Sequence, residues 1–130
     1  MADHPNVDLL RKGYDAFAKG DMDTLRDLFA EGVVWHVPGN NILSGDYEGR
    51  DAVFGFFGKL MEETGGNFRQ EIHDVLANDT HGVVLVDVHA ERGGKSFDSH
   101  AAHVMHIENG QVTEFWNLVE DATKADDFWS

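Results

Sequence analysis

The sequence has no cysteine, and it contains only two prolines and ten basic residues among its 130. Without cysteine, the chain can form neither a disulfide framework nor a thiolate nucleophile. No apolar run approaches the ~20 residues that a membrane-spanning helix needs. The opening segment, MADHPNVD, shows no basic region followed by an apolar stretch, as a secretory signal would. We therefore expect a cytoplasmic protein that does not insert into a membrane.

The shortage of basic residues leaves a strongly negative chain. Twenty-four acidic residues against ten basic ones give a formal net charge of -14. Such a surface repels phosphate backbones and anionic lipids, because proteins that bind them need clustered Lys and Arg. We expect no nucleic-acid partner and no membrane partner.

The hydrophobic patterning predicts one domain over residues 1–130, with α+β architecture. Apolar residues at helical spacing predict helices from about 6 to 20, 21 to 32 and 50 to 64. β-branched and aromatic segments predict strands at 33–37, 68–77, 82–91, 95–107 and 111–121. Short turn-like intervals join the last four, which indicates an antiparallel meander with the helices on one side. The segment PGNNILSGDYEG is rich in turn residues, and Phe128 and Trp129 in the tail are expected to fold back onto the body.

This order of elements, with the segments AKGDMDTLRDLF, VVWHVPG, SGDYEGRDAV and HVMHIENGQVTEFW, resembles the SnoaL-like branch of the nuclear transport factor 2-like superfamily. The resemblance covers essentially the whole chain. It implies a cone-shaped fold, in which a curved antiparallel sheet wraps three helices from the N-terminal half and encloses a pocket. Relatives of this kind include polyketide cyclases, ketosteroid isomerases and epoxide hydrolases, so the resemblance implies a fold more specifically than a reaction.

The resemblance does not carry over the catalytic residues of the ketosteroid isomerases. Their oxyanion-hole tyrosine corresponds to Gly13, and Tyr14 lies one step away, or 100° around a helix. Their basic aspartate corresponds to Val37, and their protonated aspartate falls nearest His103 or Ala102. The Asp-Arg-Asp cluster of the epoxide hydrolases has no counterpart on the expected strands. Both activities are therefore disfavoured, and the acid/base carboxylate of the cyclases cannot be assigned to a residue.

The segment HAAHVMH, residues 100 to 106, spaces three histidines in a way that suggests a metal site. On a strand, however, side chains alternate between faces, so His100 and His106 share one face and His103 lies on the other. The odd-numbered positions Phe97, Ala101, Met105 and Ile107 are apolar, which predicts that His103 points inward with them. We expect His100 and His106 to face solvent or a partner subunit, and we expect no metal and no cofactor.

The placement of Asp87 and His89 depends on the turn at residues 92–94. A three-residue loop with a glycine bulge puts them on the same face as His103, whereas a two-residue Gly-Gly turn puts them on the opposite face. In the first arrangement Asp87, His89 and His103 could also form a metal site of two histidines and one carboxylate. We take the first arrangement as the prediction for the pocket and leave the second open.

These patterns predict an aromatic pocket that holds a small apolar molecule. The candidate catalytic residues are His103 and Asp87, because a histidine beside a carboxylate is a suitable acid/base couple. The candidate substrate contacts are Tyr14, Trp35, Phe57, His89, Met105, Phe115 and Asn117. The expected function is a cofactor-independent cyclase or isomerase that works by proton transfer. The alternative is a non-catalytic ligand-binding or dimerisation module in which His103 is a hydrogen-bonded core residue.

The strand at 82–91 has a second apolar face. Val84, Val86 and Val88 form this face, in addition to the apolar odd-numbered positions of the following strand. A sheet that is apolar on both sides needs a cover on its outer face, and a second copy is the simplest one. We therefore expect a homodimer that associates through the sheet.

Overall fold

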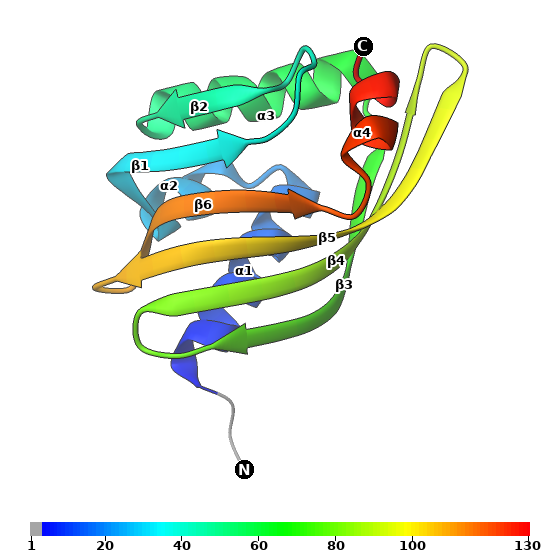
Figure 1. Ribbon diagram of the computed structural model, residues 1–130. Coiled ribbons are helices and arrows are strands. Elements are labelled where there is room, and N and C mark those ends of the chain that lie inside the picture. Colours follow the sequence, from blue (N-terminus) through cyan, green and yellow to red (C-terminus); the bar gives the residue numbers. More distant parts are fainter. Residues whose placement is uncertain (1–3) are drawn as a thin grey trace.

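The computed structural model describes residues 4–130, which form four helices and six strands (Figure 1). In chain order these are α1 (Pro5–Lys19), α2 (Met22–Leu28), β1 (Phe29–Val37), β2 (Gly45–Glu48), α3 (Arg50–Thr64), β3 (Phe68–Ala77), β4 (His81–Arg92), β5 (Lys95–Glu108), β6 (Gln111–Val119) and α4 (Ala122–Phe128). None of these helices is long and apolar enough to cross a membrane.

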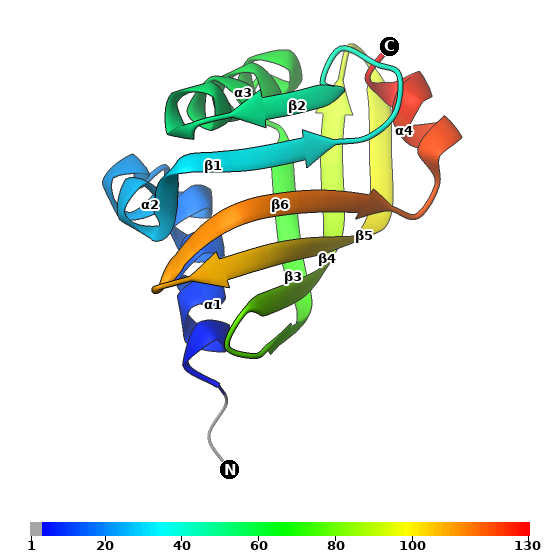
Figure 2. The same ribbon diagram turned by 60° about the vertical axis from the view of Figure 1, so that its left-hand side comes forward.

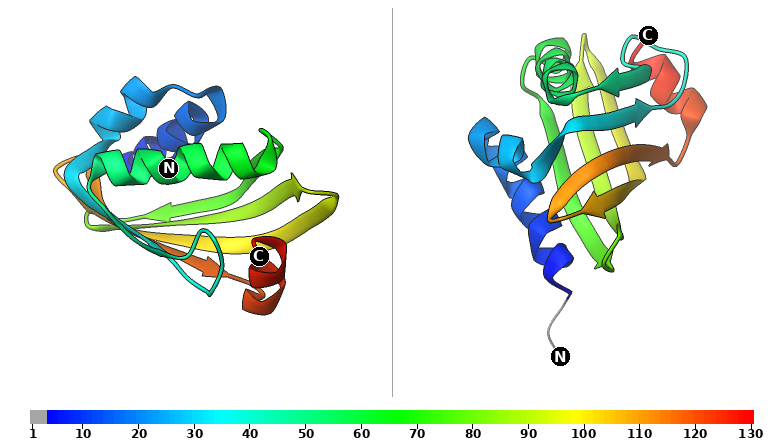
Figure 3. Two further views of the ribbon diagram at one scale, coloured as in Figure 1. Left: turned by 90° about the horizontal axis from the view of Figure 1, so that it is seen from above. Right: turned by 90° about the vertical axis from the view of Figure 1, so that its left-hand side faces the viewer.

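The strands make a single sheet in the order β2-β1-β6-β5-β4-β3. All neighbouring pairs are antiparallel except β1 and β6, which run parallel. The sheet curves strongly, and α1, α2 and α3 lie together on its concave side (Figures 2 and 3). Helix α4 follows the end of β6, whereas α2 lies near the start of that strand (Figure 2). The predicted α+β fold class and the antiparallel meander of the last four strands are thus confirmed.

Helix α1 begins and ends where its sequence provides caps. Pro5 occupies the first turn, where its missing N–H is not needed, and the His4 side chain accepts a hydrogen bond from the Asn6 N–H. At the other end Gly20 adopts a left-handed conformation with φ of 72°, which glycine reaches without steric cost. Between these caps Val7 and Leu10 are buried against the sheet, and the same face carries Tyr14 inward.

Three expectations from the sequence were wrong or incomplete at this level. The second helix ends at Leu28 rather than near Gly32, because the backbone turns extended at Phe29, which pairs with Val112 as β1 begins. The turn-rich segment contains the short strand β2, and the tail contains α4. Phe128 and Trp129 are buried, so the tail does fold back as expected.

The close approach of α1 to β4 depends on a glycine. A methyl group at Gly82 would lie 2.4 Å from Leu10 Cδ1 and 3.3 Å from Ile107 Cδ1. Leu10 is buried, at 3% exposure, so a methyl group at position 82 would require the side chains of Leu10 and Ile107 to shift within the core. By contrast, no neighbouring atom lies within 4 Å of the corresponding position at Gly58 in α3.

These two glycines predict opposite responses to the same substitution. Gly82→Ala should lower the free energy of unfolding by about 1–3 kcal/mol, because the added methyl overpacks the contact between α1 and β4. Gly58→Ala should raise it by about 0.5–1 kcal/mol, because alanine loses less backbone entropy in a helix interior. Urea unfolding of both variants measures the difference. A Gly82→Ala protein as stable as the wild type would contradict the packing of α1 on β4.

Candidate functional site

A cavity of about 150 Å³ lies between the helices and the concave face of the sheet. Its walls are largely aromatic, and Trp35 and Phe115 stack at 3.7 Å between ring centroids with their planes only 7° apart. Other aromatic side chains reach the cavity from α1, α3 and the C-terminal segment, namely Phe17, Phe57 and Trp129. Such a lining binds apolar ligands by removing their surface from water.

One hydrogen-bonded polar pair projects into this apolar space. His103 on β5 is 5% exposed, and its Nδ1 shares a hydrogen bond with the hydroxyl of Tyr14 on α1, 89 residues away in sequence. The two rings lie roughly parallel, with centroids 5.8 Å apart. His103 therefore points inward, as strand alternation predicted. Tyr14 also reaches the cavity, as predicted for a substrate contact, although it lies one residue after Gly13, the position that matches the oxyanion-hole tyrosine of the ketosteroid isomerases.

Burial determines the protonation of this pair. It lowers the pKa of His103 from 6.5 to about 3, because a buried imidazolium loses its hydration. Burial likewise raises the pKa of the Tyr14 hydroxyl, since a phenolate would also be desolvated. Both side chains are therefore uncharged at neutral pH, and the site presents neutral hydrogen-bonding groups rather than an ion pair.

Asn117 adds an unpartnered amide oxygen beside this pair. It lies directly across from His103 on the neighbouring strand β6, and it lines the same cavity. Its Oδ1 atom is buried and has no hydrogen-bond partner in the described part of the chain. Because buried polar atoms are nearly always paired in proteins, this oxygen is a candidate contact for a bound molecule.

The prediction that Asp87 and His89 share the face of His103 is wrong. Gly93 and Gly94 form a two-residue turn with φ of 55° and 81°, and Arg92 pairs with Lys95. This register places both side chains on the convex face of the sheet. There Asp87 Oδ1 lies 2.5 Å from His100 Nδ1, and His89 Nδ1 lies 2.5 Å from Asp98 Oδ1.

The same register reverses the expectation for the valines of β4. Val84, Val86 and Val88 are 0%, 1% and 8% exposed and face the helices, so they belong to the core. The convex face instead carries the side chains of Val83 and Leu85, which are only partly buried.

The convex face also carries the remaining histidines of β5. His106 Nδ1 lies 3.6 Å from Glu114 Oε1, and His36 on β1 bonds to Glu114 and Asp46. The hydrogen bond to Glu114 contributes most, and the one to Asp46 less, to a raised pKa of His36. Within residues 4–130, no three His, Asp or Glu side chains are grouped so that they could hold a metal ion. The three histidines of HAAHVMH thus belong to two different environments.

All the predicted substrate contacts except His89 reach the cavity. Its lining includes Tyr14, Trp35, Phe57, Met105, Phe115 and Asn117. Sequence reasoning missed four polar lining residues, Asn41, Gln70, Ser99 and Asp126. Ser99 could have been found by extending the alternation of β5. Asp126 could not, because its position depends on α4, which the sequence pattern did not show.

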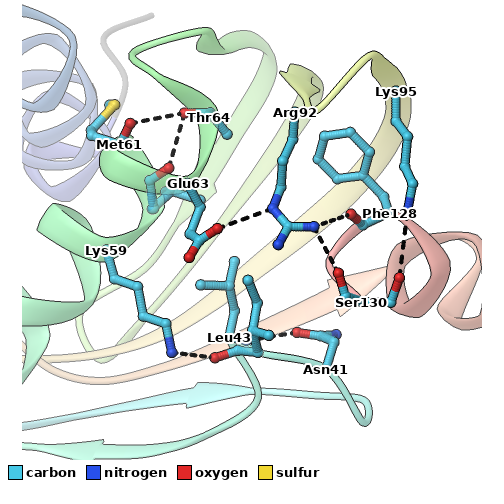
Figure 4. A network of polar contacts seen from close by, with 12 residues as sticks. Asn41, Leu43, Lys59, Met61, Glu63, Thr64, Arg92, Lys95, Phe128 and Ser130 are labelled. Atoms are coloured by element: carbon cyan, nitrogen blue, oxygen red, sulfur yellow. Dashed lines mark hydrogen bonds and ion pairs between the residues drawn. The ribbon is translucent and has the colours of Figure 1, made fainter.

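The C-terminal segment closes one end of the cavity and is held by polar contacts at the β4–β5 turn (Figure 4). The Arg92 guanidinium bonds to Glu63 on α3 and donates to the carbonyl oxygens of Phe128 and Ser130 at 3.1 and 2.8 Å. Asp126 accepts hydrogen bonds from the Asn40 N–H and the Asn41 amide, and these bonds lower the pKa of its carboxyl. This carboxylate is therefore tied to the wall of the cavity mouth.

Comparison with known proteins matches residues 10–115 to the model of the SnoaL-like domain. An uncharacterized protein of Mycobacterium tuberculosis is 31% identical over 131 residues, which cover 100% of both chains. The structure of Bal32a, from a soil-derived mobile gene cassette, has 39% identity and a TM-score of 0.92 over 96% of each chain. IdmH of Streptomyces antibioticus, suggested to be a polyketide cyclase, has 19% identity and a TM-score of 0.76 over 94% of this chain and 96% of its own. The last likeness concerns the fold alone.

The burial of neutral His103 predicts a pH dependence of stability. Between its ordinary pKa of 6.5 and its folded pKa of about 3, the unfolded chain binds a proton that the folded chain does not. The free energy of unfolding therefore carries no penalty from His103 above pH 6.5. It falls on acidification below that pH, by up to about 1.4 kcal/mol per pH unit. Urea unfolding between about pH 4 and pH 7 should show a shallower slope for His103→Gln than for the wild type.

His36 provides a control, because its effect on stability should change with pH in the opposite direction. Because its folded pKa is raised, its contribution is present below the unfolded value of 6.5 and is lost as the pH rises through the folded value. His36→Gln should therefore cost more stability in acid than in base. Identical pH profiles for the wild type and His103→Gln would show that His103 is not held neutral by burial.

Proposed function

Because the chain belongs to the SnoaL-like domain family, we propose that it is a cofactor-independent enzyme of the cyclase or isomerase type. It moves protons on a small, mainly apolar molecule held in the cavity. The observation that supports this proposal is the neutral, hydrogen-bonded Tyr14–His103 pair in a mainly apolar cavity, beside the unpartnered amide oxygen of Asn117. The suggested polyketide cyclase activity of IdmH, which has a similar fold, is consistent with this reaction class.

The lining favours an uncharged substrate. No Lys or Arg is among the residues that line the cavity, and the single acidic one, Asp126, is already bonded to Asn40 and Asn41. A carboxylate or phosphate would enter without a counter-charge, at a large desolvation cost. A neutral molecule with apolar rings and a carbonyl or hydroxyl group suits this lining, because Tyr14, His103 and Asn117 can bond to its polar atoms.

His103 is the catalytic residue of this proposal. Its imidazole is neutral near pH 7, and Nδ1 is already bonded to Tyr14, so Nε2 is the nitrogen available to a ligand. Asp87 has no part in the proposal, because it lies on the convex face. Acid/base catalysis by a positioned side chain typically contributes about 100-fold to 10,000-fold in rate.

A non-catalytic binding module is the second candidate, and one observation favours it. A histidine whose pKa is lowered to about 3 is a weak base, and it has lost the expected carboxylate partner Asp87 to the convex face. A pure binder would hold its ligand unchanged. Binding and proton transfer must therefore be measured separately on the same molecule.

2-Tetralone, a neutral bicyclic ketone with acidic protons next to its carbonyl, serves as the probe. In D2O the protein should accelerate the exchange of these protons for deuterium, followed by NMR. His103→Gln should lower the accelerated rate about 100-fold or more while the protein stays folded, because glutamine cannot cycle a proton. His100→Gln, the matched control on the convex face, should leave the rate unchanged. Saturable binding of 2-tetralone without accelerated exchange would favour the binding module.

We further propose that two copies associate through the convex face of the sheet. Two apolar rows cross this face: Leu76, Val83, Val104 and Trp116 pair across four strands, and Leu85, Ala102 and Leu118 pair across three. Leu76 and Leu118 are 51% and 55% exposed and are the large apolar side chains most exposed in residues 4–130. A contiguous apolar surface of this kind is typical of an interface. A second copy, as in a closed two-fold dimer, would cover both rows.

Light scattering should therefore give twice the chain mass of 14.5 kDa at micromolar concentration. Leu118→Asp should shift the protein to monomer, because it places a carboxylate in one of the two apolar rows. Asn67→Asp, which adds the same charge at the exposed turn after α3, should leave the dimer intact. A wild-type monomer under these conditions would rule out the dimer.

A further inference from the structure

The Tyr14–His103 pair has two uncharged arrangements of its protons. In one, the Tyr14 hydroxyl donates to Nδ1 of His103, and Nε2 carries the imidazole proton. In the other, Nδ1–H donates to the Tyr14 oxygen, whose own proton is free to point at a ligand, and Nε2 offers a lone pair. Both fit the hydrogen bond between Tyr14 Oη and Nδ1, since a neutral imidazole can carry its proton on either nitrogen. The two arrangements differ by the positions of protons only.

We propose that Tyr14 and His103 act as one bifunctional unit, which takes a proton from carbon and delivers another to the carbonyl oxygen of an enolisable ketone. This inference rests on the proposed function and deepens it, since it assigns Tyr14 a catalytic role and names the substrate class. Tyr14 and His103 both line the cavity, so one ligand can contact both.

The proton transfers balance without any net charge. The Nε2 lone pair of His103 takes a proton from the carbon next to the ketone, so that this C–H bond breaks and an N–H bond forms. The proton on Nδ1 passes to the Tyr14 oxygen, and the former Tyr14 hydroxyl proton passes to the carbonyl oxygen. The product is a neutral enol. In the reverse sequence Nε2–H protonates the same carbon or another carbon of the enol system, and the enol proton returns through Tyr14 to Nδ1.

The surroundings of the pair favour this coupled route over a charged intermediate. If His103 acted alone as a base, it would become a buried imidazolium without a carboxylate to pair with. The one acidic residue that lines the cavity, Asp126, is already bonded to Asn40 and Asn41. If Tyr14 acted alone as an acid, it would leave a buried phenolate. Burial lowers the pKa of His103 and raises that of Tyr14, so each ion is costly by itself. The coupled transfer forms neither ion.

The same surroundings define the substrate class. The ketone must be uncharged, since no Lys or Arg lines the cavity, and its rings must be apolar to pack on Trp35 and Phe115. Asn117 Oδ1, directly across from His103, can accept a hydrogen bond from a donor group of the ligand, since it has no partner within residues 4–130. 2-Tetralone, an uncharged bicyclic ketone with a fused benzene ring, meets the conditions of charge and ring packing, and it leaves Asn117 Oδ1 without a donor.

A double-mutant cycle on the full chain tests the coupled unit. The exchange of 2-tetralone protons in D2O is measured at saturating ketone for the wild type, Tyr14→Phe, His103→Gln and the double variant. Tyr47→Phe is the matched control, because Tyr47 is the only other tyrosine, is not among the residues that line the cavity, and bonds through its hydroxyl to the Leu43 carbonyl. Binding of 2-tetralone by ligand-observed NMR and a thermal melt show that each variant is folded.

The expected result is a loss of about 100-fold or more for each single variant and no further loss for the double variant, because residues that act as a unit are not additive. Binding should change little, and Tyr47→Phe should match the wild type. If the wild type accelerates exchange but Tyr14→Phe keeps its rate, or if the two losses multiply, the coupled unit is wrong while the proposed function survives. If the wild type binds 2-tetralone without accelerating exchange, both fail.

Should His103→Gln not fold, a second measurement tests the coupled unit without it. Fluorotyrosine incorporated into the Tyr47→Phe protein labels Tyr14 alone and makes its hydroxyl more acidic. The coupled unit predicts that the exchange rate changes with this acidity at unchanged binding. A rate that does not respond to it would overturn the inference.

Discussion

The hydrogen bond between Tyr14 and His103 joins the helical layer to the sheet at the wall of the cavity. Each partner is a polar group in apolar surroundings, and a buried polar group left unpaired costs about 1–3 kcal/mol. The bond therefore requires α1 to approach β5 at a fixed distance and phase. The glycine at position 82 allows this approach, because any larger side chain would meet Leu10 on α1. The chemistry of the site and the packing of the fold thus depend on the same contact.

The two faces of the sheet keep two kinds of histidine chemistry apart. On the concave face His103 is neutral and bonded to an uncharged hydroxyl. On the convex face His36 and His100 are bonded to carboxylates in partial contact with water. The separation follows from the alternation of side chains along a strand, since neighbouring residues of β5 differ in face and therefore in dielectric environment. The carboxylates of the convex face therefore lie outside the cavity and do not pair with His103.

Much of this arrangement could be predicted from the sequence, because periodic patterns cover long segments. The apolar odd-numbered positions of β5 were enough to place His103 inward and His100 outward. Asp87 was misplaced because its face depends on whether two or three residues form the turn at Gly93 and Gly94, and both fit the residue types. Helix α4 has only seven residues, and its Asp121 N-cap is not followed by a helical period long enough to identify it, so Asp126 was not placed. The bond from Tyr14 to His103 joins residues 89 apart, and only the folded chain shows it.

The site depends above all on His103 being a neutral imidazole, bonded through Nδ1 to Tyr14. Nitrogen NMR of the histidine rings tests this state without knowledge of any substrate. We expect that, between about pH 5 and pH 8, one ring nitrogen of His103 stays protonated and the other unprotonated, with no titration. We also expect a slowly exchanging Tyr14 hydroxyl proton close to Nδ1. A His103 ring that gains a second proton with a midpoint near 6.5, like a solvated histidine, would contradict the neutral, buried pair.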